Sequence, residues 1–197
     1  MQLNAEDSDK RKYILVQLPE LCDEATDAYK AGYKNICEIG KERIRRAGKR
    51  ILKEHPECKD KLDIGFRVLK IDSTNMEDVY YTPDHIDTND LFKNNIKSDR
   101  TGEDLLFQTM LDLGIMLSSK IETKKINGKE VFCVEGNYLM ACFDDSVDEK
   151  TITEIAKEKP YYFVMRDPAN SKDSDSLITN FEQIFTTYSP ETVSKVL

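Results

Sequence analysis

The dipeptide Asn127-Gly128 restricts the fold of this chain most, because it predicts a tight β-hairpin. Asparagine and glycine both tolerate the positive φ that a type I′ turn requires at its two central positions. The flanking segments, residues 120–126 and 129–134, have the length and composition of strands. A hairpin contains an antiparallel pair, so a sheet built around it is expected to be mixed if parallel strands also join it.

Helical and strand-like patterns alternate along the rest of the chain. Thr101 is a good helix N-cap, and Asp104 lies three residues later, as in a capping box. The predicted strands are residues 13–18, 63–71, 120–126, 129–134, 138–143 and 161–165, and the predicted helices are 36–51, 87–97, 101–118, 148–157 and 175–187. This alternation predicts the α/β fold class.

Charge and a proline indicate two domains. Residues 1–62 carry 14 Lys and Arg against 12 Asp and Glu, whereas residues 63–197 carry 15 against 25. Pro56 disfavours helical geometry at His55 and so predicts the end of the preceding helix. We therefore expect one domain over residues 1–55 and a second, acidic domain over residues 56–197. The net charge of −10 after residue 62 argues that the second domain does not grip a phosphate backbone.

Composition excludes several classes of protein. The chain has five cysteines at irregular spacing, no C-x-x-C pair and two histidines, which predicts neither a metal site nor a disulfide framework. It contains no apolar run of about 18 residues and no signal-peptide pattern near Met1. No nucleotide-binding or nucleophile motif is present, so no catalytic residue is assigned. The chain is expected to be a cytoplasmic protein with reduced thiols and no membrane partner.

A basic amphipathic helix follows the first predicted strand. Within residues 41–53, seven basic side chains face one acidic one; they are Lys41, Arg43, Arg45, Arg46, Lys49, Arg50 and Lys53. Such a face contacts DNA phosphates in some proteins, and Arg43, Arg45, Arg46, Lys49 and Arg50 are the candidates here. The alternative is a solvated face whose cations pair with Glu38 and Glu42. Gly40 and Gly48 weaken the helix but also permit close packing against a sheet.

Six sequence segments together resemble the modification subunit of type III restriction-modification systems. They are ILVQLPE (14–20), AYKAGYKNICEIGKERIRRAGKRI (28–51), GFRVLKIDSTN (65–75), IKSDRTGEDLLFQTMLDLG (96–114), KPYYFVMRD (159–167) and NFEQIFTTYSPETVSKVL (180–197). In their order and amino-acid sequence, these segments look like the C-terminal third of that family's proteins. The resemblance implies a C-terminal fragment of an adenine-specific DNA methyltransferase. Residues 1–55 would be the remnant of its Rossmann-like sheet, and residues 56–197 a mixed-sheet α/β domain for assembly.

The resemblance also implies a cofactor and partners for the intact protein. The cofactor would be S-adenosylmethionine, and Gln17, Leu18 and Glu20 lie where the second strand of such a sheet contacts it. The family usually has an acidic residue at the position of Gln17, so this chain departs from the pattern. The family's partners are DNA, a second modification subunit and a restriction subunit with helicase and nuclease activities. On the residues alone, the alternative is a buried strand followed by a loop with a solvated glutamate.

Two motifs of the family are absent. The F-x-G-x-G cofactor loop does not occur, and Asp167-Pro168-Ala169-Asn170 shares only its first two letters with the catalytic D-P-P-Y motif. Base-modifying enzymes stack the flipped base on aromatic side chains and hydrogen-bond its edge, and no such set can be assigned here. We therefore predict that the isolated chain is inactive. The alternatives are a stand-alone α/β protein-interaction module and an accessory DNA-backbone-binding module that uses the basic helix.

Overall fold

The computed structural model describes residues 1–77, 95–168 and 174–197. The chain divides into two compact units, Met1–Ile71 and Asp72–Leu197. The sequence placed a boundary at His55-Pro56, where the long helix of the first unit ends; a 3-10 turn, η1 (Pro56–Cys58), follows, and the first unit continues to Ile71. Part of the segment predicted as helix over residues 87–97 lies outside the described residues. Near the end of that segment, Ile96 pairs with Met76 in an isolated antiparallel bridge.

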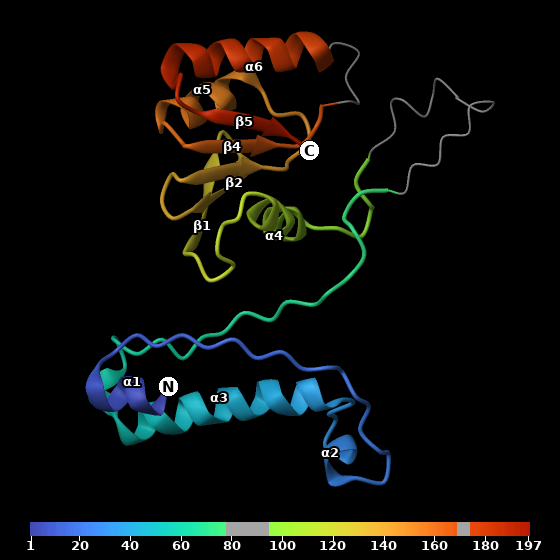
Figure 1. The fold of residues 1–197 in the computed structure, drawn as a ribbon, viewed down its shortest axis with the longest axis vertical. Helices are drawn as coiled ribbons and strands as arrows, with labels where there is room; N and C mark the ends of the chain where they lie inside the picture. Colours follow the sequence, from blue (N-terminus) through green and yellow to red (C-terminus); the bar gives the residue numbers. More distant parts are fainter. Residues whose placement is uncertain (78–94, 169–173) are drawn as a thin grey trace, which may run out of the picture. The chain divides into compact units, whose positions relative to one another are not determined.

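The first unit is built around one long helix. It contains α1 (Gln2–Asp7), α2 (Asp27–Lys30) and α3 (Ile36–Glu54) (Figure 1). Asn35 caps α3 by accepting a hydrogen bond from the backbone N–H of Glu38, which satisfies a donor that the first helical turn leaves unpaired. The predicted helix over residues 36–51 is therefore confirmed.

The second unit is a five-stranded mixed sheet with helices on both faces. Its strands are β1 (Ile121–Ile126), β2 (Lys129–Val134), β3 (Leu139–Cys142), β4 (Tyr162–Met165) and β5 (Val193–Val196), in that order across the sheet. The first three strands pair antiparallel and the last three parallel. The hairpin at Asn127-Gly128 is confirmed, with positive φ at both residues. The α/β class and the mixed sheet are also confirmed.

Three helices cover the sheet of the second unit. They are α4 (Gly102–Asp112) on one face, and α5 (Glu149–Lys157) and α6 (Ser174–Tyr188) on the other (Figure 1). The crossovers from β3 to β4 and from β4 to β5 advance in one direction across the sheet. Because such crossovers are almost always right-handed, both of their helices are expected on the same face, as observed. Successive strand residues alternate between two buried clusters; Phe132 packs toward α4 and Cys133 toward α5 and α6.

Two predicted strands and one helix boundary are wrong. Residues 13–18 and 63–71 belong to no sheet, because no neighbouring strand supplies their backbone hydrogen bonds within the described chain. The helix that begins after Thr101 ends at Asp112 rather than near Ser118, since Gly114 adopts a left-handed φ of +68° and the N–H of Ile115 bonds back to Met110. The sequence did not predict β5 or the short helix α2.

Candidate functional site

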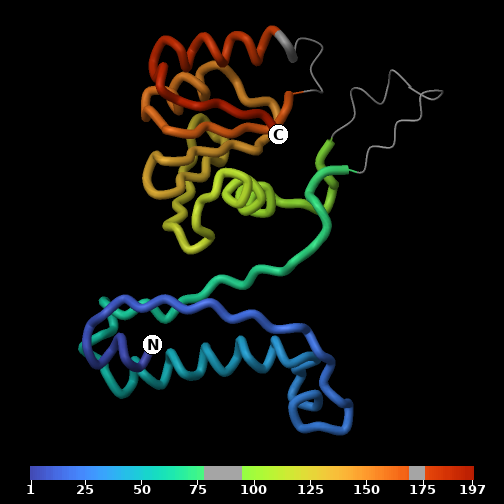
Figure 2. The backbone as a smooth tube through the Cα atoms, viewed as in Figure 1, coloured from blue at the N-terminus to red at the C-terminus, as the bar shows by residue number. Residues whose placement is uncertain are grey.

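Two extended segments of the first unit lie along α3. Figure 2 shows residues 11–20 and 62–71 running in the same direction, opposite to the helix between them. The thiol of Cys37 lies 3.6 Å from the carbonyl oxygens of Gln17 and Leu18, which brings the first segment to the start of α3. The second segment packs farther along, with the guanidinium of Arg45 5.6 Å from the ring centroid of Phe66. This is the chain order of a strand–helix–strand unit, without strand pairing.

The apolar side chains of the first segment and of the end of the second face solvent, whereas Ile64 and Phe66 are partly buried. Ile14 and Val16 are each 90% exposed, and Leu18 is 72% exposed. On the second segment, Val68 and Leu69 are about half exposed, and Ile71 is fully exposed. Within the described chain, no backbone hydrogen bond joins one segment to the other. Burying a side chain of this size stabilises a protein by roughly 1.5–3 kcal/mol, so this surface forgoes several such contributions.

The predicted cofactor residues lie close together at the end of the first segment. Gln17 donates a hydrogen bond from its side-chain amide to the carbonyl of Leu18, and the side chains of all three residues are exposed. The carbonyl of Glu20 accepts from the N–H of Ile36 at 3.0 Å, so the segment ends beside the N-terminus of α3. The structure thus places Gln17, Leu18 and Glu20 together at one exposed site, and their contact with a cofactor stays a prediction.

Several cations on the basic face of α3 are paired with neighbouring side chains. Arg46 bonds Glu42 at 2.7 Å and the hydroxyl of Tyr33 at 3.3 Å. Arg50 pairs with Glu54 at 3.1 Å. The guanidinium of Arg45 lies over the ring of Phe66, while Arg43 and Lys49 are exposed. Beside Arg46, the pKa of Glu42 lies below its usual range, chiefly because the guanidinium donates a hydrogen bond to the carboxylate. The pairs at Arg46 and Arg50 are those expected of a solvated helix face.

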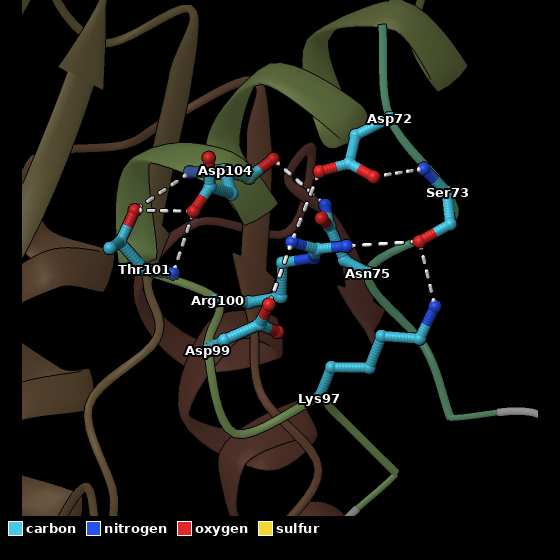
Figure 3. A network of polar contacts seen from close by, with 8 residues as sticks. All are labelled: Asp72, Ser73, Asn75, Lys97, Asp99, Arg100, Thr101 and Asp104. Carbon is cyan, nitrogen blue, oxygen red and sulfur yellow. Dashed lines mark hydrogen bonds and ion pairs between the residues drawn. The ribbon is translucent and has the colours of Figure 1, made fainter. Parts of the chain in front are cut away.

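In the second unit, a polar network joins residues 72–75 to the start of α4 (Figure 3). Arg100 is its centre: its side chain is only 12% exposed, its Nη1 lies 3.3 Å from Asp99 and 3.5 Å from Asp72, and its Nη2 donates to the hydroxyl of Ser73. Lys97 donates to the same hydroxyl at 2.9 Å. The Nε of Arg100 is buried without a hydrogen-bond partner among the described residues.

The same network contains the cap of α4. Thr101 and Asp104 form a complete capping box, and the side chain of Asn75 donates to the carbonyl of Asp104 (Figure 3). Hydrogen bonds from Thr101 lower the pKa of Asp104, and the N–H of Ser73 together with Arg100 lowers that of Asp72. Neither carboxyl group is therefore a proton donor at neutral pH. The arrangement ties chain segments together and has no layout for acid–base catalysis.

Other features give no catalytic centre within residues 1–77, 95–168 and 174–197. These residues contain no group of three or more His, Cys, Asp or Glu side chains arranged to hold a metal ion. Asp144 and Asp145, which follow β3, have structural roles: Asp144 accepts the N–H of Glu130, and Asp145 pairs with Arg166 at 2.6 Å. Ala169 and Asn170 of the D-P-A-N sequence lie outside the described residues. In the described part of the chain, no helix is long and apolar enough to cross a membrane.

Comparison with known proteins gives one relation and no family assignment. No family model matches the chain. Over 67 residues the chain is 39% identical to the Type III restriction-modification enzyme StyLTI Mod subunit of Salmonella typhimurium. The match covers 34% of this chain and 10% of that subunit, so the chain spans only a small part of the curated relative's length. Over that stretch, the chain is similar to a type III Mod subunit.

Proposed function

We propose that this chain is part of an adenine-specific DNA methyltransferase, the modification subunit of a type III restriction-modification system. The observation that carries the proposal is the unpaired strand–helix–strand order of the first unit. Ile14, Val16 and Leu18 present an apolar row, and no strand among the described residues pairs with their backbone. An apolar extended edge of this kind is expected to be covered in the working protein. The similarity to the StyLTI Mod subunit supports a methyltransferase sheet as the cover.

In this proposal, the first unit completes the cofactor-binding domain. Residues 13–18 and 63–71 would be neighbouring parallel strands connected through α3, as in a doubly wound sheet. Ligands of such sheets bind at the carboxyl ends of the strands, and Gln17, Leu18 and Glu20 occupy that end of the first segment. They would contact S-adenosylmethionine once the glycine-rich loop and the D-P-P-Y motif are supplied by the rest of the protein. By itself, the chain is expected not to methylate DNA.

The second unit is assigned to assembly. Helices cover both faces of its sheet. The unit carries 13 Lys and Arg against 24 Asp and Glu, and this excess of negative charge disfavours contact with DNA phosphates. An acidic domain without an arrangement for catalysis fits contact with protein, either a second modification subunit or the restriction subunit.

The first test is to read the genomic frame upstream of the Met1 codon. A continuous frame that encodes F-x-G-x-G and D-P-P-Y is the expected result. A stop codon followed by a ribosome-binding site would overturn the proposal and leave a stand-alone α/β interaction module.

A second test asks whether the exposed segment pairs with the upstream part. Co-expression with the polypeptide encoded upstream is expected to give a complex in which the amides of Ile14, Val16 and Leu18 exchange at least tenfold more slowly than in the chain alone. Val16→Asp is expected to abolish the complex, whereas Leu111→Asp, at an exposed position on α4, is expected to retain it. A complex that forms equally well with Val16→Asp would contradict the assignment of this segment as a strand of the methyltransferase sheet.

Contact between α3 and DNA phosphates is a secondary proposal, supported by the exposed cations Arg43 and Lys49. Each phosphate contact steepens the fall in affinity with salt. In the whole protein, the double variant Arg43→Glu/Lys49→Glu is expected to reduce the slope of log affinity against log salt by about 2. An unchanged slope would make this face a solvated one.

A further inference from the structure

An open cavity lies at the end of the second unit's sheet where the parallel strands β3 and β4 begin. It has a volume of about 640 Å³ and is lined by Glu135, Asn137, Tyr138, Lys159, Pro160, Tyr161, Tyr188, Ser189, Pro190 and Glu191. Tyr138 directly precedes β3, Tyr161 precedes β4, and Tyr188 is the last residue of α6. The pairing of β3 with β4 therefore places Tyr138 beside Tyr161, and the end of α6 adds Tyr188 to the same cavity.

The three rings are unusually exposed for aromatic side chains in a folded unit. Tyr138 and Tyr188 are each 43% exposed, and Tyr161 is 51% exposed. The rings of Tyr138 and Tyr161 stack with centroids 5.3 Å apart and planes within 2° of parallel. Tyr162 braces both rings edge-on, at 5.7 Å from Tyr138 and 4.8 Å from Tyr161. Clustered, partly exposed tyrosines are typical of the centres of binding surfaces.

Hydrogen bonds hold the walls of this cavity in place. The side-chain amide of Asn137 donates to the carbonyls of Glu158 and Lys159, and the N–H of Tyr161 donates to the carbonyl of Asn137. In the loop after α6, the hydroxyls of Ser189 and Thr192 bond each other at 2.7 Å, and that of Thr192 donates to the carbonyl of Pro160. A surface that is already ordered loses little conformational entropy on binding.

The charge of the unit indicates what such a surface accepts. Exposed aromatic rings bind either nucleobases, by stacking, or cations, through the ring quadrupole. The second unit has a net formal charge of −11, which repels a phosphate backbone and attracts a cation. Two glutamates and one lysine line the cavity. The cluster already borders one cation, since the amino group of Lys157 lies 6.0 Å from the ring centroid of Tyr188.

We propose that the cavity at Tyr138, Tyr161 and Tyr188 docks an arginine side chain from an extended segment of a protein partner. The planar guanidinium would stack on an exposed tyrosine ring, while Glu135 and Glu191, which line the cavity, complement its charge. Arginine suits this site better than lysine, because it combines a flat, weakly hydrated cation with aromatic stacking. The inference rests on the assembly role proposed for the second unit and names the surface that would perform it.

The test uses the full chain labelled with 3-fluorotyrosine, whose nine tyrosine signals can be assigned by single Tyr→Phe variants. The probe is a blocked, unstructured hexapeptide with one central arginine and otherwise Gly and Ser. The same peptide with citrulline, which is neutral but nearly isosteric, is the matched control. We expect the arginine peptide to shift the signals of Tyr138, Tyr161 and Tyr188, and to bind about tenfold more tightly than the citrulline peptide.

Variants connect the binding to the cavity. Glu191→Gln is expected to weaken the arginine peptide severalfold, whereas Glu103→Gln, at an exposed carboxylate on α4, leaves it unchanged. Tyr161→Ala is expected to abolish binding and Tyr161→Phe to retain it. Equal affinity for the two peptides, or unmoved signals at millimolar peptide, would overturn the proposal even if a variant failed to fold. A thymidine decamer that shifted the same signals would replace it with nucleobase stacking. None of these results depends on the upstream reading frame, so the two proposals can fail separately.

Discussion

Gly48 of α3 lies directly against Ile64: a Cβ atom added to the glycine would come within 3.1 Å of the Cβ of that isoleucine. The helix and the second extended segment are therefore in contact at a point where only a hydrogen atom fits comfortably. Gly40, two turns earlier in the same helix, has no atom within 4 Å of the corresponding position. Both glycines belong to α3, but only Gly48 lies where a neighbouring segment packs closely against the helix.

This difference predicts different changes in stability for two identical substitutions. Gly40→Ala is expected to stabilise the first unit by about 0.5–1 kcal/mol, because alanine favours the helix and nothing obstructs its methyl group. In Gly48→Ala the added methyl group contacts Ile64 too closely, and this crowding offsets the gain in helix stability. Urea unfolding of both variants measures the difference. A Gly48→Ala variant as stable as Gly40→Ala would show that residues 62–71 do not press on α3 in solution.

The core of the second unit should respond sharply to truncation on one side of α4. Leu106 is fully buried against the sheet, whereas Leu111 on the same helix is 64% exposed. Leu106→Ala is expected to lower the free energy of unfolding by about 2–5 kcal/mol, since it removes buried methyl groups and leaves a cavity. Leu111→Ala should change it by less than about 0.5 kcal/mol. Thermal unfolding monitored by circular dichroism would test both, and similar losses would mean that α4 packs through another face.

The capping box of α4 gives a smaller effect. The hydroxyl of Thr101 accepts from the N–H of Asp104 at 3.3 Å, while the Asp104 carboxylate accepts from the N–H of Thr101 at 2.8 Å. Thr101→Ala is expected to cost about 1 kcal/mol of stability, and Thr186→Ala, at an exposed position within α6, less than half of that. Because hydrogen bonds from Thr101 lower the pKa of Asp104, the contribution of Asp104 is present above its ordinary pKa and disappears as the pH falls. The parent chain should therefore lose more stability than Thr101→Ala between pH 5 and pH 2. An equal loss in the two chains would mean that the capping box contributes nothing.

The cysteines should separate into two classes of reactivity. Cys133 and Cys142 are buried in the sheet, and burial raises the pKa of Cys142 to about 11 from an ordinary value of 9.0. Iodoacetamide at pH 8 is expected to modify Cys22, Cys37 and Cys58 in the folded chain, and the two buried thiols only after unfolding. Mass spectrometry of the peptides counts the modified sites. Rapid alkylation of Cys142 would show that the sheet opens readily.

The same shift sets a direction for stability at high pH. Folding holds the Cys142 thiol in its neutral form, so its contribution is complete below the ordinary pKa and is lost as the pH rises from about 9 toward about 11. The Cys142→Ala variant should lose less stability than the parent chain over that interval. Denaturant titrations at pH 8 and pH 10.5 provide the comparison.

The sequence was most informative where a local signal and the tertiary packing agree. The hairpin at Asn127-Gly128 needs positive φ, which those residues tolerate, and the helices α3, α4 and α5 begin at side-chain caps supplied by Asn35, Thr101 and Asp148. Helical hydrogen bonds lie within one segment, so a helix can be predicted from that segment alone. The candidate residues Gln17, Leu18 and Glu20 were assigned from the resemblance and from the end of an apolar run, and their contact with a cofactor stays a prediction.

The tyrosine cavity could not be predicted from the sequence. Tyr162 packs edge-on against the rings of Tyr138 and Tyr161. Tyr138 and Tyr188 come from other parts of the chain, and only the pairing of β3 with β4 and the end of α6 bring them beside Tyr161. No spacing in the sequence indicates a site whose members are separated by more than 20 residues.

Strands show most clearly what depends on tertiary structure. Residues 13–18 are strongly apolar and were predicted as a strand, yet they have no sheet partner here. Val193–Val196 is exposed and has a weak strand pattern, yet it forms β5 because β4 presents an unpaired edge beside it. The sequence by itself decided where helices and turns begin, since those elements satisfy their backbone hydrogen bonds locally. A strand must obtain its hydrogen bonds from another part of the chain, so only the tertiary structure decided which extended segments became one.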